Sequence, residues 1–250
     1  SLVAFLLGTT ACTCPHPQYS NPTSPGRIIP AGEIPSPSDV ARDARAARIV
    51  MERSAPNGVI TIFGSARAKP GTASYDQTHA FAFQWTQHHG EAYPILTGGS
   101  HGIMEAGNKG AHEAGGKSLY FSTYFKGGVE DSVNSYVTDG YLGSSFAQRE
   151  ADLVDYAAGV IVAPGGVGTS WEIFETLSKV QTRKKNPCPI ILLGTKATWE
   201  PLFAYMDHLA KLGTISPDDT KLLQRAETPE EAIKLLETAL FDTRQSKVIR

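Results

Sequence analysis

The segment PGGVGTSWE at positions 164–172 has the residue types of an anion-binding loop. It follows an apolar run and precedes a stretch of helix-forming residues. Glycines let a backbone approach a phosphate closely, and the first turn of a helix offers free N–H groups with partial positive charge. Thr169 and Glu172 also have the spacing of a helix capping box, which is the structural alternative. Three glycines and a proline favour phosphate binding, to which Thr169 would add a hydroxyl donor.

A second glycine-rich segment, TGGSHGIMEA, occupies positions 97–106. Its GxSxG pattern, centred on Ser100, has the spacing of a hydrolase nucleophile elbow. Asp152 or Asp155, and then His208, follow Ser100 in the order of a catalytic triad. Only two predicted strands precede the segment, which argues against a serine hydrolase. We therefore favour a glycine-rich turn in which Ser100 caps the next helix, and keep the hydrolase as an alternative.

The elements that position these segments alternate along the chain. Strands are predicted at 59–63, 92–96, 118–122, 159–163 and 189–193. Helices are predicted at 39–53, 75–89, 103–114, 146–156 and 171–182, and a further one begins at Thr228-Pro229. Near-continuous apolar strands separated by helices indicate an α/β, Rossmann-like fold, with a parallel sheet covered by helices on both faces. Both glycine-rich segments follow strands, at the edge where such sheets bind ligands.

Composition excludes several classes of function. The 250 residues are 41% hydrophobic and 19% charged, which is typical of a globular protein. A formal net charge of −2 gives no general electrostatic reason to bind nucleic acid or an acidic membrane surface. Three cysteines, an odd number, argue against a disulfide framework, and the histidines form no metal-binding HExxH pattern.

We predict that the chain divides into an N-terminal arm with a leading helix, 1–57, and a Rossmann-like catalytic domain, 58–250. Residues 15–38 are rich in Pro, Ser and Gly and predict an extended arm, and Ser38 or Asp39 is a candidate cap for the leading helix. The apolar run at 2–7, which leads to Cys12, is too short to span a bilayer. We expect a cytoplasmic protein without stable membrane insertion, while the resemblance of this run to a secretion or lipoprotein signal leaves export open.

In this order along the chain, the segments resemble the Lonely Guy family, also described as lysine decarboxylases, over roughly residues 58–240. PGGVGTSWE matches the PGGxGTxxE signature of that family at every fixed position. Weaker likenesses support it: GSAR at 64–67, GGSxGIMEA at 98–106, ExxxNxYV at 130–137, and QTxK at 181–184, the last typical of the larger bacterial branch.

The resemblance implies a phosphoribohydrolase, and also implies a homodimer and no cofactor. Such an enzyme hydrolyses the N-glycosidic bond of AMP or an N6-modified AMP, a cytokinin nucleotide, to the free base and ribose 5-phosphate. The two catalytic residues of the family correspond to Arg149 and Glu172, which are 172 − 149 = 23 residues apart as its pattern requires. The implied substrate-binding positions are Gly64, Ser65, Gly99, Ser100, Met104, Glu130, Gly165, Gly166, Val167, Gly168, Thr169 and Ser178.

The chemistry suits these residue types. Cleavage passes through an oxocarbenium-like ribose, which the carboxylate of Glu172 can stabilise. An arginine stays protonated, so Arg149 can anchor the substrate or stabilise charge on the departing base but cannot act as a general acid. The chain departs from the family at four positions: Ala147 replaces a histidine, Glu150 a lysine, Ser100 a glycine, and Ser178 a threonine.

Two other functions compete with this one: the serine hydrolase described above and a carrier protein. A non-catalytic nucleotide or molybdenum cofactor carrier is similar in fold and also uses glycine-rich loops. Lysine decarboxylation needs pyridoxal phosphate on a Schiff-base lysine, and no segment of the sequence resembles such a site.

Overall fold

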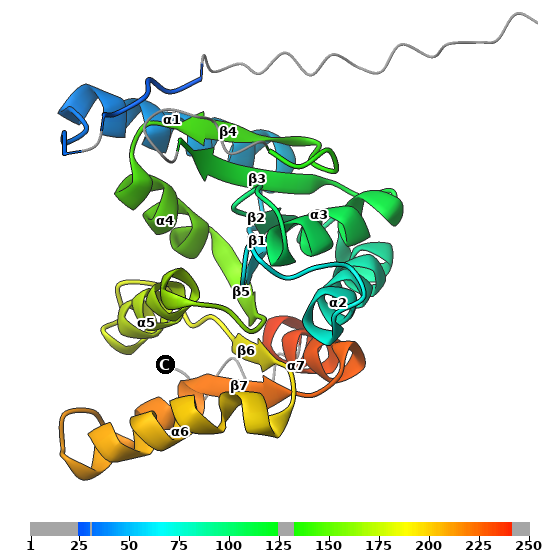
Figure 1. Cartoon of the computed structure of the whole chain (residues 1–250), viewed down its shortest axis with the longest axis vertical. Helices are drawn as coiled ribbons and strands as arrows, with labels where there is room; N and C mark the ends of the chain where they lie inside the picture. Colours follow the sequence, from blue (N-terminus) through cyan, green and yellow to red (C-terminus); the bar gives the residue numbers. More distant parts are fainter. Residues whose placement is uncertain (1–24, 31, 125–132, 242–250) are drawn as a thin grey trace, which may run out of the picture.

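The computed structural model describes residues 25–30, 32–124 and 133–241 (Figure 1). These residues contain a seven-stranded sheet with the order β4-β3-β2-β1-β5-β6-β7, in which each strand is parallel to its neighbours. The predicted parallel α/β fold is therefore confirmed.

The strands lie close to where the sequence predicts them, with two additions at the edges. Their bounds are β1 Val59–Phe63, β2 Ile95–Thr97, β3 Ser118–Thr123, β4 Asp139–Gly143, β5 Ala157–Val162, β6 Ile190–Leu193 and β7 Leu223–Ala226. The sequence does not predict β4, which reads DGYLG, or β7, which reads LQRA. Both are edge strands and lack the continuous apolar run of a strand buried on both faces.

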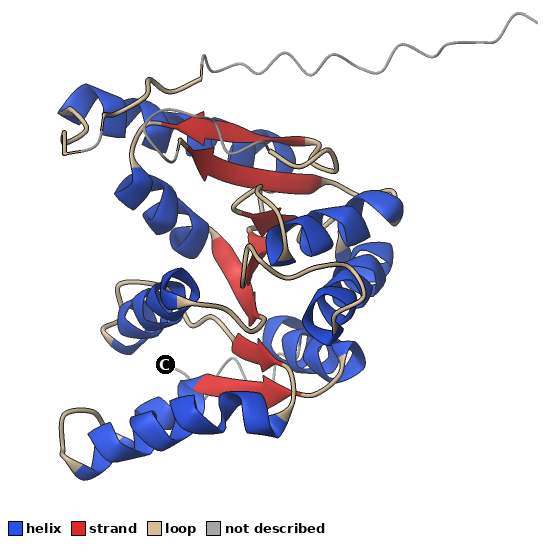
Figure 2. Ribbon diagram, in the orientation of Figure 1, coloured by secondary structure: helices blue, strands red, loops and turns tan. Residues whose placement is uncertain are grey.

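Helices cover both faces of the sheet (Figure 2). Their bounds are α1 Pro37–Ser54, α2 Ala73–His89, α3 Ile103–Glu113, α4 Phe146–Asp155, α5 Val167–Gln181, α6 Lys196–Lys211 and α7 Pro229–Phe241. One apolar core lies beneath α1, α4, α5 and α6, and the other beneath α2, α3 and α7. Successive side chains of β1 point to opposite faces of the sheet, so this strand contributes to both cores. Val59 and Phe63 belong to the first core, and Ile60 and Ile62 belong to the second.

Helix α1 begins earlier than predicted. Its N-cap is Ser36, whose hydroxyl accepts a bond from the amide of Asp39, while the Asp39 carboxylate accepts one from the amide of Ser36 at 2.9 Å. The prediction of Ser38 or Asp39 as the cap is wrong because Pro37 already occupies the first helical position, which proline favours. The apolar face of α1 packs against β4 and belongs to the core. Residues 1–24, with the apolar run at 2–7 and Cys12, lie outside the described residues.

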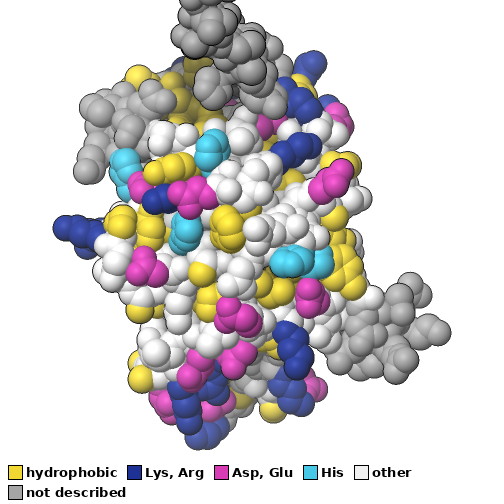
Figure 3. All heavy atoms as spheres, turned by 90° about the vertical axis from the view of Figure 1, so that its right-hand side faces the viewer, with side chains coloured by type: hydrophobic (Ala, Val, Ile, Leu, Met, Phe, Trp, Pro, Cys, Tyr) yellow, Lys and Arg dark blue, Asp and Glu magenta, His cyan; other side chains and the backbone are white. Residues whose placement is uncertain are grey.

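Acidic, basic and histidine side chains are interspersed on the face shown in Figure 3. Hydrogen bonds link neighbouring helices: Nε2 of His79 in α2 lies 2.7 Å from the carboxylate of Glu113 in α3, and Nε2 of His89 in α2 lies 2.7 Å from that of Glu237 in α7. None of the helices in the described ranges is both long and apolar enough to cross a membrane.

The order of the strands fixes where a ligand site can form. From β1 the chain proceeds through β2, β3 and β4 toward one edge, and β5 then returns to the other side of β1. The connections after β1 and β5 therefore diverge, which leaves a crevice outside their carboxyl ends.

Candidate active site

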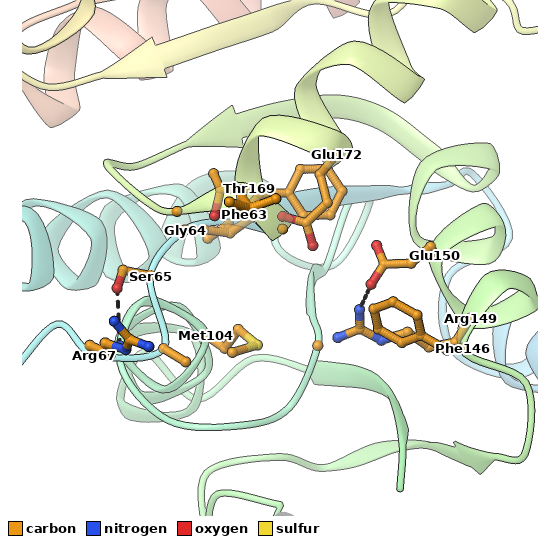
Figure 4. Close-up of a pocket in the computed structure, with 16 residues that line it drawn as sticks. Phe63, Gly64, Ser65, Arg67, Met104, Phe146, Arg149, Glu150, Thr169 and Glu172 are labelled. Atoms are coloured by element: carbon orange, nitrogen blue, oxygen red, sulfur yellow. Dashed lines mark hydrogen bonds and ion pairs between the residues drawn. The ribbon is translucent and has the colours of Figure 1, made fainter. Parts of the chain in front are cut away.

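A cavity of about 520 Å³ lies at this crevice (Figure 4). Four segments form it: the end of β1 with the loop after it, the loop after β2 with the start of α3, the first turn of α4, and the first two turns of α5. The lining residues are Ile62, Phe63, Gly64, Ser65, Ala66, Arg67, Gly98, Met104, Phe146, Arg149, Glu150, Gly166, Val167, Gly168, Thr169 and Glu172.

The loop before α5 presents free backbone N–H groups. Helix α5 begins at Val167, and its N-cap is Gly166, which makes no side-chain capping bond. The first amides of the helix therefore lack partners within it. Thr169 and Glu172 both lie inside the helix, so the capping-box interpretation is wrong. A Cβ on Gly165 would overlap the side chain of Thr169, whereas Gly166 faces open space, and an anion can approach the backbone there.

Helix α1 fixes the start of α4. The Asp43 carboxylate, which is buried, accepts hydrogen bonds from the amides of Ser144 at 2.8 Å and Ser145 at 2.7 Å. Ser145 is the N-cap of α4, and its hydroxyl accepts a bond from the amide of Gln148. Asp43 therefore fixes the first turn of α4, from which Arg149 projects into the cavity.

The Arg149 guanidinium is held on three sides, although it lines the cavity. The residue is 5% exposed. Its Nε donates to the carbonyl of Phe121 at 3.0 Å, and its Nη1 donates to Oε1 of Glu150. A Cβ on Gly98 would overlap Nη2, so the close passage of Arg149 requires glycine at this position. The sequence alone gives a lone arginine in a polar helix, with no sign of this burial.

Two glutamates lie near Arg149. Glu172 of α5 and Glu150 of α4 both turn their carboxyl groups toward the cavity (Figure 4). Burial raises the pKa of Glu172 well above its usual range, the nearby Glu150 carboxyl raises it further, and Arg149 opposes the shift. Burial also raises the pKa of Glu150, against the attraction of Arg149. Arg149 is thus a permanent cation beside two acids that resist ionisation, and Arg67 is a second arginine in the cavity lining.

The loop after β2 is held from outside the cavity. The side-chain amide of Asn134 donates to the carbonyls of Gly99 at 2.9 Å and Ser100 at 3.0 Å. The N-cap of α3 is Gly102, without a side-chain bond, so the prediction that Ser100 caps this helix is wrong. Neither backbone geometry nor burial could have been read from the TGGSHG pattern alone.

The serine hydrolase alternative fails on topology. Ser100 follows the carboxyl end of β2, whereas Asp155 directly precedes the amino end of the parallel strand β5. His208 lies in the last turn of α6, which returns toward that same amino edge. The Asp152 carboxylate already accepts hydrogen bonds from Tyr141 at 2.7 Å and Gln148 at 2.9 Å, so it does not orient a catalytic histidine.

The cavity collects most of the residues that the sequence singles out, and their roles remain predictions. Nine of them line it: Gly64, Ser65, Met104, Arg149, Gly166, Val167, Gly168, Thr169 and Glu172. Gly99, Ser100 and Gly165 belong to the adjoining loops, and Ser178 is exposed further along α5. Glu130 lies outside the described residues.

Sequence reasoning assigned no site role to several lining residues, notably Phe63, Arg67, Gly98, Phe146 and Glu150. All five lie in or beside segments already identified, and position at the carboxyl edge was the available signal. None of the described lining residues is a lysine that could form a Schiff base. Across the described ranges, no group of three or more His, Cys, Asp or Glu side chains is arranged to hold a metal ion.

Parallel strands with glycine-rich loops at a switch point define the Rossmann-like class of α/β proteins. Within it, the chain belongs to the family described as "Possible lysine decarboxylase", which matches residues 104–236, more than half of the chain. This is the Lonely Guy family, as the sequence motifs predicted.

Curated relatives are similar in sequence to part of this chain. A cytokinin riboside 5′-monophosphate phosphoribohydrolase of Rhodococcoides fascians is 30% identical over 89 residues, 36% of this chain and 44% of that protein. A probable enzyme of the same name from Oryza sativa subsp. japonica is 29% identical over 106 residues, 42% of each chain. The matched part thus spans less than half the length of these relatives.

Solved structures with the same fold include molybdenum cofactor binding and carrier proteins. The molybdenum cofactor binding protein of Rippkaea orientalis has a TM-score of 0.55 and 21% identity, over 73% of this chain and 96% of its own. The molybdenum cofactor carrier protein of Chlamydomonas reinhardtii has a TM-score of 0.55 and 22% identity, over 74% and 98%. At these identities the similarity establishes the fold alone.

Proposed function

We propose that the protein is a nucleoside 5′-monophosphate phosphoribohydrolase, which hydrolyses the N-glycosidic bond of AMP or an N6-modified AMP. One observation carries the proposal: Arg149, Glu172 and the free amides at the start of α5 line one cavity at the switch point of the sheet. The names of the curated relatives agree with it.

Each part has a chemical task in this reaction. The amides of Val167, Gly168 and Thr169 bind the 5′-phosphate, because a helix N-terminus attracts anions. Arg149 anchors the substrate or stabilises negative charge on the departing base. Glu172 stabilises the oxocarbenium-like ribose once its carboxyl group is ionised.

Incubation with a panel of nucleoside monophosphates tests this function, with released bases separated by chromatography. We expect release of adenine or an N6-substituted adenine together with ribose 5-phosphate. A carrier of a nucleotide or of the molybdenum cofactor would instead bind its ligand and return it unchanged. Binding without release of any base would therefore overturn the proposal in favour of the carrier.

The phosphate is tested separately by comparing AMP with adenosine. Charge-assisted hydrogen bonds to the phosphate are among the stronger polar contacts available to this site. AMP should therefore be cleaved far better than adenosine. Equal values of kcat/KM for the two would show that the loop does not hold the phosphate.

The homodimer implied by the family is part of the same proposal. Beside the cavity, Phe146, Val167 and Trp171 are 43%, 88% and 40% exposed, and the rings of Phe146 and Trp171 lie 5.4 Å apart. An exposed apolar group of this kind favours a protein contact. Light scattering measures the mass, and a monomer at micromolar concentration would contradict the dimer.

We place the reaction in the cytoplasm.

A further inference from the structure

Glu150 is the least expected side chain in the cavity, because it brings a second carboxyl group beside Glu172. It is 3% exposed, and its Oε1 accepts a hydrogen bond from Nη1 of Arg149. Its Oε2 is also buried but accepts no hydrogen bond from a donor among the described residues. An ionised carboxylate can only accept hydrogen bonds, and buried polar atoms normally have a hydrogen-bond partner. We therefore expect a proton either on this oxygen or on a group beside it.

The partner of that oxygen is within reach. Glu150 and Glu172 line the same cavity, and each carboxyl group influences the pKa of the other. Two neighbouring carboxyl groups repel each other when both are ionised, which favours a state in which one of them carries a proton. Figure 4 shows Glu150 placed between Arg149 and Glu172. With one proton, Arg149, Glu150 and Glu172 sum to no net charge, whereas without it two largely desolvated carboxylates would face the single guanidinium of Arg149 at a high desolvation cost.

We propose that Glu150 and Glu172 hold a single shared proton, and that Glu172 delivers this proton to the leaving base while Glu150 acts as the positioning residue. This inference rests on the phosphoribohydrolase function proposed above. It gives the site a general acid, which Arg149 cannot be.

The surrounding charges support retention of the proton on Glu172. Burial is the largest cause of its raised pKa, followed by the Glu150 carboxyl, and Arg149 acts in the opposite direction. Glu175, one turn along α5, raises the pKa of both glutamates to a smaller extent. Its carboxylate is 2.9 Å from Lys179. From the loop after β1, Arg67 also lines the cavity.

The proton and the charges balance through the reaction. As the C1′–N bond breaks, its electron pair goes to the base, and the proton of Glu172 moves to a ring nitrogen of the base. Glu172 becomes a carboxylate at the moment when positive charge develops on the ribose, which it then stabilises. Water adds to C1′ and returns one proton to the pair. The products are the neutral base and ribose 5-phosphate, and the pair is restored.

The pH profile of Glu150→Gln tests this role. Removing the Glu150 charge lowers the pKa of Glu172, so the proton is lost at lower pH and the alkaline limb of the rate profile moves toward acid. General acid catalysis contributes on the order of 100- to 10,000-fold. At the alkaline end we expect a loss of about 100-fold or more, and at the acidic end a much smaller loss. The control Glu175→Gln removes a nearby charge outside the pair and should move the limb much less.

Infrared titration of the wild-type protein gives a second readout that needs neither substrate nor a variant. A protonated carboxyl C=O band should persist at neutral pH and weaken in Glu150→Gln. If no such band is present, or if Glu150→Gln lowers the rate equally at every pH, Glu150 is only a counterion for Arg149 and the inference fails. Release of no base from any nucleotide with the band present would instead overturn the proposed function while leaving the shared proton in place.

Discussion

Replacing Glu172 by glutamine separates a catalytic carboxyl group from a structural one. The N-cap of α5 is Gly166, and Glu172 makes no capping bond, so the substitution removes no contact that holds the helix. Loss of a capping residue costs about 1 kcal/mol, which would lower Tm by roughly 2–4 °C in a domain of this size. We expect no such decrease for Glu172→Gln.

The pKa of Glu172 gives the sign of any change in stability. Because its pKa is raised in the folded state, ionised Glu172 costs stability. This cost grows as pH rises from the unfolded-state pKa of the group through its folded-state pKa. Glutamine carries no charge, so at neutral pH the variant should melt at the wild-type temperature or above it. Thermal unfolding followed by circular dichroism measures this.

The rate should respond in the opposite way. Glutamine can neither donate the proton nor become an anion, and loss of one preorganised electrostatic group costs on the order of 100- to 1,000-fold in turnover. Arg149→Ala should also be slow, and in the double variant the two losses should not multiply, because both residues act on one transition state. Release of adenine at near the wild-type rate by Glu172→Gln would refute the assignment. Glu175→Gln, on the same helix, should keep near wild-type activity at neutral pH.

Three other substitutions test the reasoning. Gly98→Ala places a methyl group against Arg149 and should displace its guanidinium. A displacement of a catalytic group by near 1 Å can lower the rate about 100-fold, and an unchanged kcat would show that the close contact is dispensable. Ser100→Ala should keep substantial activity, whereas stoichiometric labelling of wild-type Ser100 by a fluorophosphonate would restore the hydrolase alternative. Burial raises the pKa of Asp152 from 3.8 to about 6. Stability should therefore fall by up to about 3 kcal/mol as pH rises from about 4 to 6. Asp152→Asn should flatten this slope in urea unfolding, and an unchanged slope would contradict the shift.

Much of the fold follows from local sequence. The strand predicted at 59–63 has the same first and last residues as β1. Five consecutive apolar or β-branched residues suit a strand that is buried on both faces. Helices α2, α3, α4 and α7 begin within two residues of their predicted starts. Errors gather where a tertiary contact replaces a local signal. The edge strands β4 and β7 are stabilised by pairing with β3 and β6, which no local pattern reveals.

The sequence by itself determined the parallel α/β class, the family and the glycine-rich loops at the carboxyl edge, because periodicity and motif spacing are local properties. Only the tertiary structure decided which side chains meet. Reversal of strand order at β1 and β5 brings the first turn of α4 beside that of α5. Burial then makes Arg149, Glu150 and Glu172 interact strongly with one another, although they are separate polar residues in the sequence. Desolvation and contact between distant segments have no signature in the sequence, so the acid pair could be found only in the folded chain.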